Sequence, residues 1–308
     1  MNDLELALDS YLAVRRALGF KLARDEYELR RFVEYAQERQ SPIVTTAMAL
    51  DWATQSQNAA SITQAKHLGA VRGFARYLHA SDPRHEVPPV KLIPYHRFRY
   101  QPYIYSDEDV TALLAAAQRI RHPLKAATYT TVLGLLAVSG MRVGEALALD
   151  EDDVDFNDAA LFIRNSKFHK SRVLPLHSTC REALRLYADK RNELMSRPRA
   201  PSFFVSLAGT RLVIQNVQAT FWKLLHRAGL SERRPHRPRR IHDLRHSFAV
   251  TTVRRWYEAG LEVETRLPSL STYLGHVSPS ATYWYLTATP DLMALAAKRL
   301  ERAMGKLP

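Results

Sequence analysis

Six side chains in the C-terminal two thirds of this 308-residue chain have types and spacing that suit chemistry on a phosphodiester. In chain order they are Arg142, Lys167, His242, Arg245, His276 and Tyr285. Attack on a phosphodiester builds negative charge on its non-bridging oxygens. A guanidinium suits that charge because it donates through a planar fork and stays protonated. The two arginines are therefore candidates to bind a phosphate that the tyrosine hydroxyl attacks.

The order and spacing of the set carry this argument, because each residue alone has an ordinary structural explanation. A lysine in a turn is usually solvated, and a tyrosine in an aromatic helix is usually part of the core. Here Arg142 directly follows Gly140-Met141, and His242 stands three residues before Arg245, so that both share one helix face. The tyrosine then stands nine residues after the last histidine.

Together these segments resemble the tyrosine recombinase (phage integrase) family over about residues 103–300. The family pattern is an Arg in a Gly-x-Arg turn, a Lys in a β-hairpin, His-x-x-Arg, Leu-Gly-His, and a Tyr nine residues after that His. In this sequence the pattern falls on Gly140-Met141-Arg142, Lys167, His242 to Arg245, Leu274-Gly275-His276 and Tyr285.

The resemblance implies a site-specific recombinase that cleaves and rejoins DNA through a 3′-phosphotyrosyl intermediate and a Holliday junction. Its partner would be a double-stranded DNA recombination site, on which the protein would bind as a dimer, and two such sites would form a tetrameric synapse. Other recombinases or accessory proteins are possible further partners. Integration, excision, resolution and transposition all remain open. The covalent link stores the energy of the broken bond, so rejoining needs no cofactor and no metal.

Each remaining side chain then has a chemical role. A tyrosine hydroxyl, with a pKa near ~10, is a weak nucleophile at neutral pH. Tyr285 therefore needs nearby cations and a base, for which His242 is the candidate. Lys167 is the candidate general acid for the departing 5′ oxygen. His276 would donate to the phosphate and position it.

Two of these positions have a neighbour of the same type. Lys170 lies three residues after Lys167, and the family resemblance favours the earlier lysine because the family's Lys stands near the end of the first strand. Tyr283 lies two residues before Tyr285, and the distance from His276 favours the later tyrosine.

Nearby residues receive supporting roles, and some segments depart from the family pattern. We expect Glu145 to orient Arg142 or to cap its helix, and His246 to pack or to bond to backbone. The segment Glu262–Ser271 is longer than usual before Leu-Gly-His, and Pro268 is expected to start a new helix.

Composition is consistent with a nucleic-acid partner without proving one. The net charge is +13, and a basic protein with no nucleic-acid role is about as common. Residues 101–308 carry 30 Lys and Arg against 20 Asp and Glu, whereas residues 1–100 carry 14 against 11. The single cysteine, Cys180, excludes a disulfide framework and a cysteine-based zinc site. We expect a cytoplasmic protein that acts on DNA and makes no membrane contact.

The sequence predicts a mainly α protein with a small antiparallel β-sheet, organised as a two-domain DNA clamp. Residues 1–81 are expected to form helices near 4–18, 25–40, 45–56 and 61–79, similar to the family's SAM-like core-binding domain. Residues 82–103 contain five prolines and form a basic linker. Residues 104–308 form the integrase-type catalytic domain.

Within the catalytic domain, helices are expected near 107–120, 123–138, 141–149, 178–195, 213–228, 243–258, 266–274, 279–286 and 290–304. Strands are expected at 161–164 and 172–176, with a third extended piece at 203–206. Basic residues outside the six catalytic candidates are predicted to contact DNA phosphates, although those of the fourth helix could equally be a solvated face. They are Lys66, Arg72, Arg76, Arg97, Arg99, Arg233, Arg234, Arg237, Arg239 and Arg240.

The C-terminal segment 290–305 is amphipathic, and it could pack on its own domain or dock on a neighbouring protomer.

Three other hypotheses for the function of the whole chain compete with recombination. A metal-dependent phosphohydrolase lacks its usual ligand spacing here. A catalytically idle DNA-binding accessory protein would not need all six positions filled. A type IB topoisomerase-like enzyme uses similar chemistry, and only strand exchange separates it.

Overall fold

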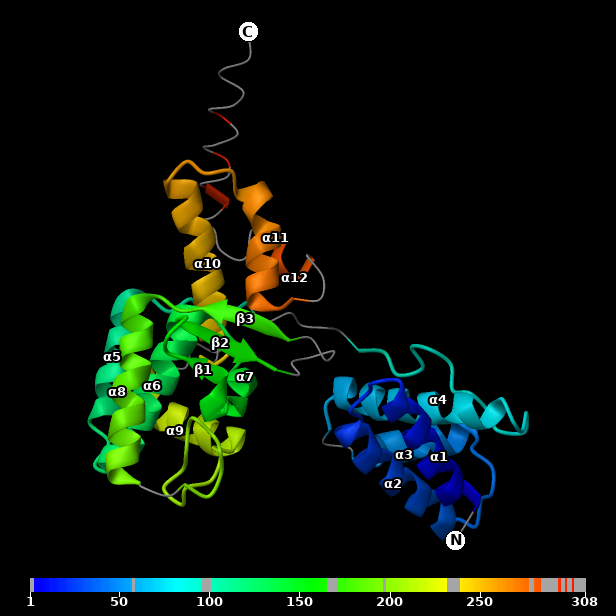
Figure 1. Cartoon of the computed structure of the whole chain (residues 1–308). Coiled ribbons are helices and arrows are strands. Elements are labelled where there is room, and N and C mark those ends of the chain that lie inside the picture. Colours follow the sequence, from blue (N-terminus) through cyan, green and yellow to red (C-terminus); the bar gives the residue numbers. More distant parts are fainter. Residues whose placement is uncertain are drawn as a thin grey trace. The chain divides into compact units, whose positions relative to one another are not determined.

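The computed structural model describes residues 3–56, 59–95, 101–164, 171–195, 198–231, 239–276 and 280–283, and a few positions beyond them (Figure 1). Contacts between Cα atoms divide the chain into two compact units, Met1–Arg99 and Tyr100–Pro308. No described helix is long and apolar enough to cross a membrane.

The first unit is built from four helices: α1 (Asp3–Ala17), α2 (Ala23–Glu38), α3 (Thr46–Thr54) and α4 (Ser61–His79). Their apolar faces meet in one core, where the rings of Phe32 and Trp52 pack edge to face with centroids 5.3 Å apart. The side chain of Thr45 caps α3 by accepting from the backbone N–H of Met48 at 3.2 Å. The four helices predicted from the sequence are confirmed within about two residues of each end.

The beginning of the expected linker packs on this helical unit. The backbone N–H of Val44 donates to Nδ1 of His85, and that of Thr46 donates to Glu86. Arg72 on α4 donates to the carbonyl oxygens of Pro88 and Pro89, at 2.7 and 2.8 Å. Proline has no N–H, but its carbonyl remains a full acceptor, so this segment is anchored through its acceptors.

The second unit is mainly helical with one small sheet. Its elements are α5 (Asp107–Gln118), α6 (Pro123–Ser139), α7 (Val143–Ala148), the 3-10 turn η1 (Glu151–Asp153), β1 (Val154–Asp155), β2 (Ala160–Ile163), β3 (Arg172–Pro175), α8 (Ser178–Leu194), α9 (Ile214–Arg227), α10 (Asp243–Glu258), α11 (Val263–Leu274) and α12 (Ser280–Tyr283). The strands pair antiparallel in the order β1-β2-β3, with Ile163 opposite Arg172. Ser106 forms the expected cap of α5, as part of a capping box.

Two apolar clusters hold this unit together. The larger one joins α5, α6, α8, α9 and the inner face of the sheet, around buried residues such as Leu133, Leu161 and Phe221. The smaller one lies between α10 and α11, where Val250 and Leu267 are buried. Figure 1 shows α10 and α11 side by side, next to the sheet. Arg245 near the start of α10 donates to the carbonyls of Gly140 and Leu274, so the N-terminal end of α10 meets the C-terminal ends of α6 and α11.

The third strand and the eleventh helix differ from the sequence-based expectation. The third strand of the sheet is β1, and the segment expected to be extended at 203–206 contributes only the isolated bridge between Val205 and Arg211. Two residues are too short for an alternating pattern, so β1 gave no signal.

Helix α11 begins at Val263 and runs through Pro268, whereas the sequence suggested a start near 266. An interior proline costs about 3 kcal/mol in a helix. Burial of Val263 and Leu267, each worth roughly 1.5–3 kcal/mol, offsets this cost.

The expected helix at 279–286 is described only as α12, and the segment 290–304 lies almost wholly outside the described residues.

Candidate active site

Four of the six predicted catalytic residues lie in the described part of the chain, and all four come from the ends of helices in the second unit. Arg142 precedes α7, His242 precedes α10, Arg245 lies in its first turn, and His276 follows α11. Lys167 and Tyr285 lie outside the described residues.

Arg142 occupies the N-cap position of α7 and is fixed by contacts at both ends. Its backbone N–H donates to Oε2 of Glu145 at 3.0 Å, and its Nη1 donates to Oε1 of the same carboxylate at 2.7 Å. Its Nη2 donates to the carbonyl oxygen of Gly275 at 2.8 Å. The expectation that Glu145 orients Arg142 and caps its helix is therefore confirmed.

Arg245 is almost completely buried, with 2% of its area exposed. Its Nη1 donates to the carbonyl of Gly140 at 2.9 Å, and its Nη2 donates to the carbonyl of Leu274 at 2.8 Å. Burying a cation costs much free energy unless it is hydrogen-bonded. These carbonyls supply part of that compensation and fix the direction of the guanidinium.

A third arginine, Arg172, completes the arrangement, and the sequence analysis did not select it. It is the first residue of β3, and its Nε donates to the carbonyl of Tyr273 at 3.0 Å. Its Nη1 and Nη2 donate to the two carboxylate oxygens of Glu145 at 3.1 and 2.8 Å. Only the strand register, which a single sequence does not fix, brings this residue to the site.

Three consecutive carbonyls at the C-terminal end of α11 thus accept hydrogen bonds from three different arginines. Tyr273 accepts from Arg172, Leu274 accepts from Arg245, and Gly275 accepts from Arg142. The last carbonyls of a helix have no intrahelical partner and carry the negative end of its dipole. The sequence therefore places three cations where the helix end stabilises them.

Glu145 is the shared anion of this cluster. Burial alone would raise its pKa, but the hydrogen bonds and charge of Arg172 and the contacts from Arg142 outweigh burial and lower the pKa to about 2. The carboxylate is therefore ionised at neutral pH. It offsets part of the mutual repulsion of the two guanidiniums that it bridges.

His242 is held beside this cluster as a neutral ring. Its ring packs edge to face on that of His246, with centroids 4.9 Å apart, and part of the residue stays exposed. Partial burial of the ring, followed by the charges of Arg245 and Arg142, lowers the pKa of His242 to about 4. A neutral imidazole at neutral pH is able to accept a proton, as the predicted role of general base requires.

His276 is neutral as well, and its orientation is set by a residue that the sequence did not point to. Burial, followed by the charges of Arg245 and Arg142, lowers the pKa of His276 to about 4. Its Nδ1 lies 2.7 Å from Oγ1 of Thr282, a buried residue of α12. When the Thr282 hydroxyl donates to Nδ1, the proton of the neutral ring is on Nε2, which is then a donor.

The residues predicted to contact DNA differ in their solvent exposure and in the contacts that they make within the protein. Lys66 and Arg76 are exposed on α4, whereas Arg72 is half-buried and bonded to the proline carbonyls described above. Arg239 bonds to the carbonyl of Leu230 and lies 4.2 Å from the centre of the Tyr103 ring. The candidates of the linker and of the arginine-rich run 233–240 that lie outside the described residues are Arg97, Arg99, Arg233, Arg234 and Arg237.

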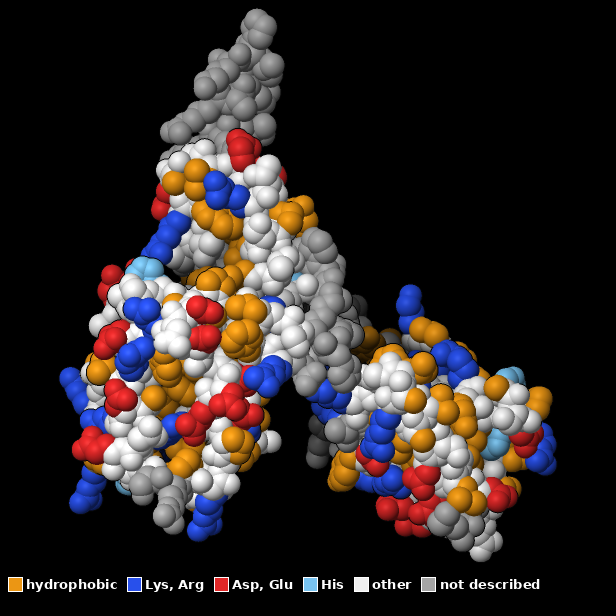
Figure 2. All heavy atoms as spheres, viewed as in Figure 1, with side chains coloured by type: hydrophobic (Ala, Val, Ile, Leu, Met, Phe, Trp, Pro, Cys, Tyr) orange, Lys and Arg blue, Asp and Glu red, His pale blue; other side chains and the backbone are white. Residues whose placement is uncertain are grey.

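Arg240 makes a local contact at the start of α10, where its backbone N–H donates to Oδ2 of Asp243 at 2.9 Å and its Nε lies 3.8 Å from Oδ1. The face in Figure 2 shows Lys and Arg side chains spread over both units and interspersed with acidic ones. Among the side chains coloured in that view, no single basic patch marks a path for DNA, so the phosphate-contact predictions stay predictions.

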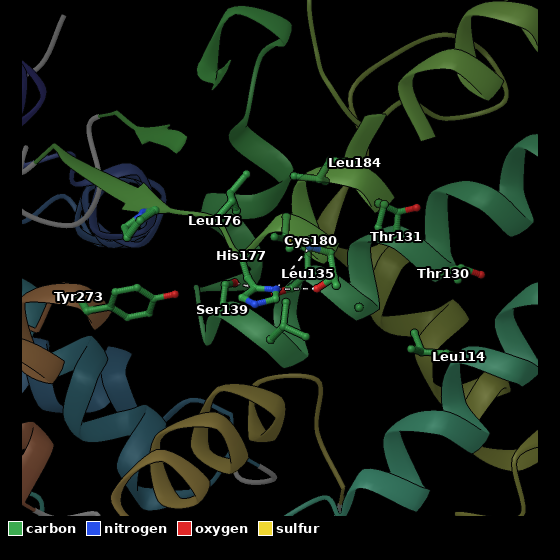
Figure 3. A pocket seen from close by; sticks show the side chains of 15 residues that line it. Leu114, Thr130, Thr131, Leu135, Ser139, Leu176, His177, Cys180, Leu184 and Tyr273 are labelled. Carbon is green, nitrogen blue, oxygen red and sulfur yellow. Dashed lines mark hydrogen bonds between the residues drawn. The ribbon is translucent and has the colours of Figure 1, made fainter. Parts of the chain in front are cut away.

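An apolar cavity of about 550 Å³ is bordered by Tyr273, whose carbonyl accepts from Arg172, but no arginine lines it (Figure 3). Residues of α5, α6 and α8 line it, including Leu135 and Cys180, and Tyr273 borders it. The mainly apolar lining provides no lysine or arginine side chain to bind a phosphate.

Among the described residues, no group of three His, Cys, Asp or Glu side chains is placed to hold a metal ion.

Comparison with known proteins gives consistent matches. Residues 104–291 match the family model described as the phage integrase family. The chain is 42% identical to a candidate integrase/recombinase, y4rB, of Sinorhizobium fredii (strain NBRC 101917 / NGR234), over 98% of each chain. It is 29% identical to the tyrosine recombinase XerC of Herpetosiphon aurantiacus, over 92% of this chain and 89% of that protein.

Among solved structures, the chain is similar to XerH site-specific recombinase bound to its palindromic difH substrate in a post-cleavage complex. The TM-score is 0.63 at 20% identity, with 91% of this chain and 77% of the other covered. At this identity the likeness concerns the fold. It agrees with the mainly helical architecture and the small antiparallel sheet of the second unit.

Proposed function

Because the chain belongs to the phage integrase family of tyrosine recombinases, we propose that it cleaves and rejoins DNA strands at specific sites through a 3′-phosphotyrosyl intermediate. The observation that carries this proposal is the convergence of Arg142, Arg245, His242 and His276 at the end of α11. Two fixed cations beside two neutral imidazoles provide both charge stabilisation and proton transfer, which phosphodiester cleavage needs.

In the proposed reaction, Arg142 and Arg245 bind the scissile phosphate through their guanidinium groups. Tyr285 attacks the phosphorus, and His242 accepts the phenolic proton. His276 donates to a non-bridging oxygen, and Lys167 protonates the departing 5′ oxygen. The reverse steps, with a 5′ hydroxyl as the nucleophile, rejoin the strand without ATP.

The binding of DNA is proposed to use both units as a clamp. The helical unit 1–81 and the basic linker 82–103 would contact one part of the duplex, and the catalytic unit 104–308 another. Most of the affinity would come from phosphate contacts, so binding should weaken steeply with salt. Of the predicted contact residues that the structure describes, Lys66 and Arg76 on α4 are the ones that are exposed.

Recombination further requires four protomers on two sites, which exchange strands in two steps through a four-way junction. The amphipathic segment 290–305 is proposed to dock on a neighbouring protomer and so to couple the active sites. Deleting the chain after Pro290 tests this point. Unchanged synapsis and strand exchange in the truncated protein would rule the docking out.

Covalent trapping tests the proposed chemistry without knowledge of the DNA site. The purified protein is incubated with nicked duplexes of random sequence and denatured, and only DNA that remains attached is recovered and sequenced. The wild type should form adducts and release a 5′ hydroxyl that a polynucleotide kinase can label. Tyr285→Phe should form none, whereas Tyr283→Phe, which changes an exposed side chain of α12, should retain them.

The outcomes separate the competing functions. Specific binding without any adduct would favour a catalytically idle accessory protein. Adducts without exchange between two differently marked duplexes would favour an enzyme that acts like a type IB topoisomerase. Adducts that survive Tyr285→Phe and disappear in Tyr283→Phe would reassign the nucleophile.

A further inference from the structure

Arg172 makes an unusual set of contacts for a residue at the start of a short strand. Its guanidinium joins β3 to the end of α11 through the Tyr273 carbonyl, and to α7 through both oxygens of Glu145. Its side chain is only 12% exposed. Three elements that are distant in sequence are therefore held together by one side chain.

These contacts lead directly to residues that bind the phosphate in the proposed mechanism. Glu145, which accepts from Arg172, also accepts from Nη1 of Arg142. The Tyr273 carbonyl, which accepts from Nε of Arg172, is three residues before His276 on the same turn. A shift of Arg172 would therefore move both the Arg142 guanidinium and the turn that carries His276.

The planar fork of arginine matters for this arrangement. Arg172 donates in two directions at once, through Nε to a carbonyl and through two Nη atoms to one carboxylate. A lysine ammonium is a point charge, which can neutralise Glu145 but cannot make both contacts with fixed geometry. Arg172→Lys therefore keeps the charge of the cluster and removes its geometry.

We propose that Arg172 is a positioning residue for catalysis, which holds Arg142 and the turn 273–276 in register with the scissile phosphate through Glu145 and the Tyr273 carbonyl. This inference rests on the proposed function. Arg172 itself takes no part in proton transfer. Its loss should slow the chemical step because misplacing a catalytic group by about 1 Å can cost about 10²-fold in rate.

The test measures single-turnover formation of the covalent adduct, at saturating protein, on a DNA site recovered by the trapping experiment. Arg172→Lys is expected to slow adduct formation about 10²-fold while DNA affinity changes less than about twofold. The matched control is Arg191→Lys. Arg191 is also buried, and it likewise donates to a backbone carbonyl, that of Phe203, and to a carboxylate, that of Glu151.

A second substrate separates positioning of the phosphate from protonation of the leaving group. In a duplex with sulfur at the 5′-bridging position, the departing thiolate needs no proton. Lys167→Ala should regain most of its lost rate on this substrate, whereas Arg172→Lys should remain about as slow as on ordinary DNA.

Two results would overturn the proposal. In one, Arg172→Lys loses no more activity than Arg191→Lys at a temperature where both are folded, which would make Arg172 a purely structural residue. In the other, sulfur substitution restores Arg172→Lys, which would mean that it acts on the leaving group. Failure of the wild type to form any adduct would instead count against the proposed function.

Discussion

Replacing Gly140 with alanine should destabilise the second unit more than a change of one methyl group usually does. Gly140 ends α6 with φ +60°, and a left-handed conformation costs a residue with a Cβ roughly 1–2 kcal/mol. The added Cβ would also clash with the ring of Phe248 and would lie 3.1 Å from Cδ2 of Leu274. Overpacking of this kind costs typically 1–3 kcal/mol, so the total is about 2–5 kcal/mol.

Two other glycines of the same unit separate these contributions. Gly229 has φ +70° but nothing within 4 Å of an added Cβ, so Gly229→Ala should cost only the backbone strain, about 1–2 kcal/mol. Gly144 lies inside α7 with equally open surroundings, and Gly144→Ala should be neutral or stabilise by roughly 0.5–1 kcal/mol.

Thermal unfolding of the whole chain, followed by circular dichroism, measures the three variants side by side. At about 2–4 °C for each kcal/mol, Gly140→Ala should lower the Tm of the transition that reports the second unit by roughly 4–20 °C. Gly229→Ala should fall between it and the wild type. If Gly140→Ala and Gly229→Ala unfold at the same temperature, close packing at the turn contributes nothing and the reasoning fails.

The same turn also carries the carbonyl that orients Arg245. Gly140→Ala should therefore reduce adduct formation even at temperatures where the variant is fully folded. Gly229→Ala, whose residue contacts none of the site residues described above, serves as the control for a general loss of stability.

Three further predictions concern charge. The pKa of His276 is lowered to about 4 from an ordinary 6.5, so the unfolded chain binds the extra proton first as pH falls. Stability should therefore decrease as pH drops from about 6.5 to 4, and this contribution should level off below. His276→Gln should make the dependence of Tm on pH shallower over that window without abolishing it, because His242 has a similarly lowered pKa. Arg245→Lys should slow adduct formation at least about 10²-fold with little change in the salt dependence of DNA binding, because the ammonium cannot reach both carbonyls and the phosphate. An Arg245→Lys protein that forms adducts at the wild-type rate would contradict the assigned role. Lys66→Ala and Arg76→Ala should each lower the slope of log Kd against log salt by about 0.9 in titrations of duplex DNA, and an unchanged slope would remove α4 from the interface.

The sequence predicted most of the helical framework because its signals are local. Apolar residues recur with helical spacing, Ser106 caps α5, and Gly140 and Gly275 end α6 and α11 in left-handed conformations. The same locality explains what was missed. The two-residue strand β1 has no period, and the start of α11 was misplaced because Pro268 is an unfavourable residue that the burial of its neighbours overrides.

The candidate site shows the same division. Arg142, His242, Arg245 and His276 were predicted from their spacing; the structure brings Arg142, Arg245 and His276 to the end of α11, and places His242 close enough for the charges of both arginines to lower its pKa. The partners that orient them were harder to find, except for Glu145, which follows Arg142 by one helical turn. Arg172 and Thr282 reach the site only through strand register and the path of the chain after α11, which depend on tertiary packing.

The three carbonyls at the end of α11 also bear on how quickly the protein can engage its substrate. The guanidiniums of Arg142, Arg172 and Arg245 repel one another because all three are positively charged. Side chains as long as arginine also lose much rotational freedom when they are fixed. The helix end and Glu145 compensate the repulsion while the chain folds, and the hydrogen bonds fix the rotamers before any ligand arrives. A phosphate bound there as proposed would meet a preorganised receptor, and we expect its association to be limited by diffusion, electrostatic steering and loss of water rather than by rearrangement of the arginines.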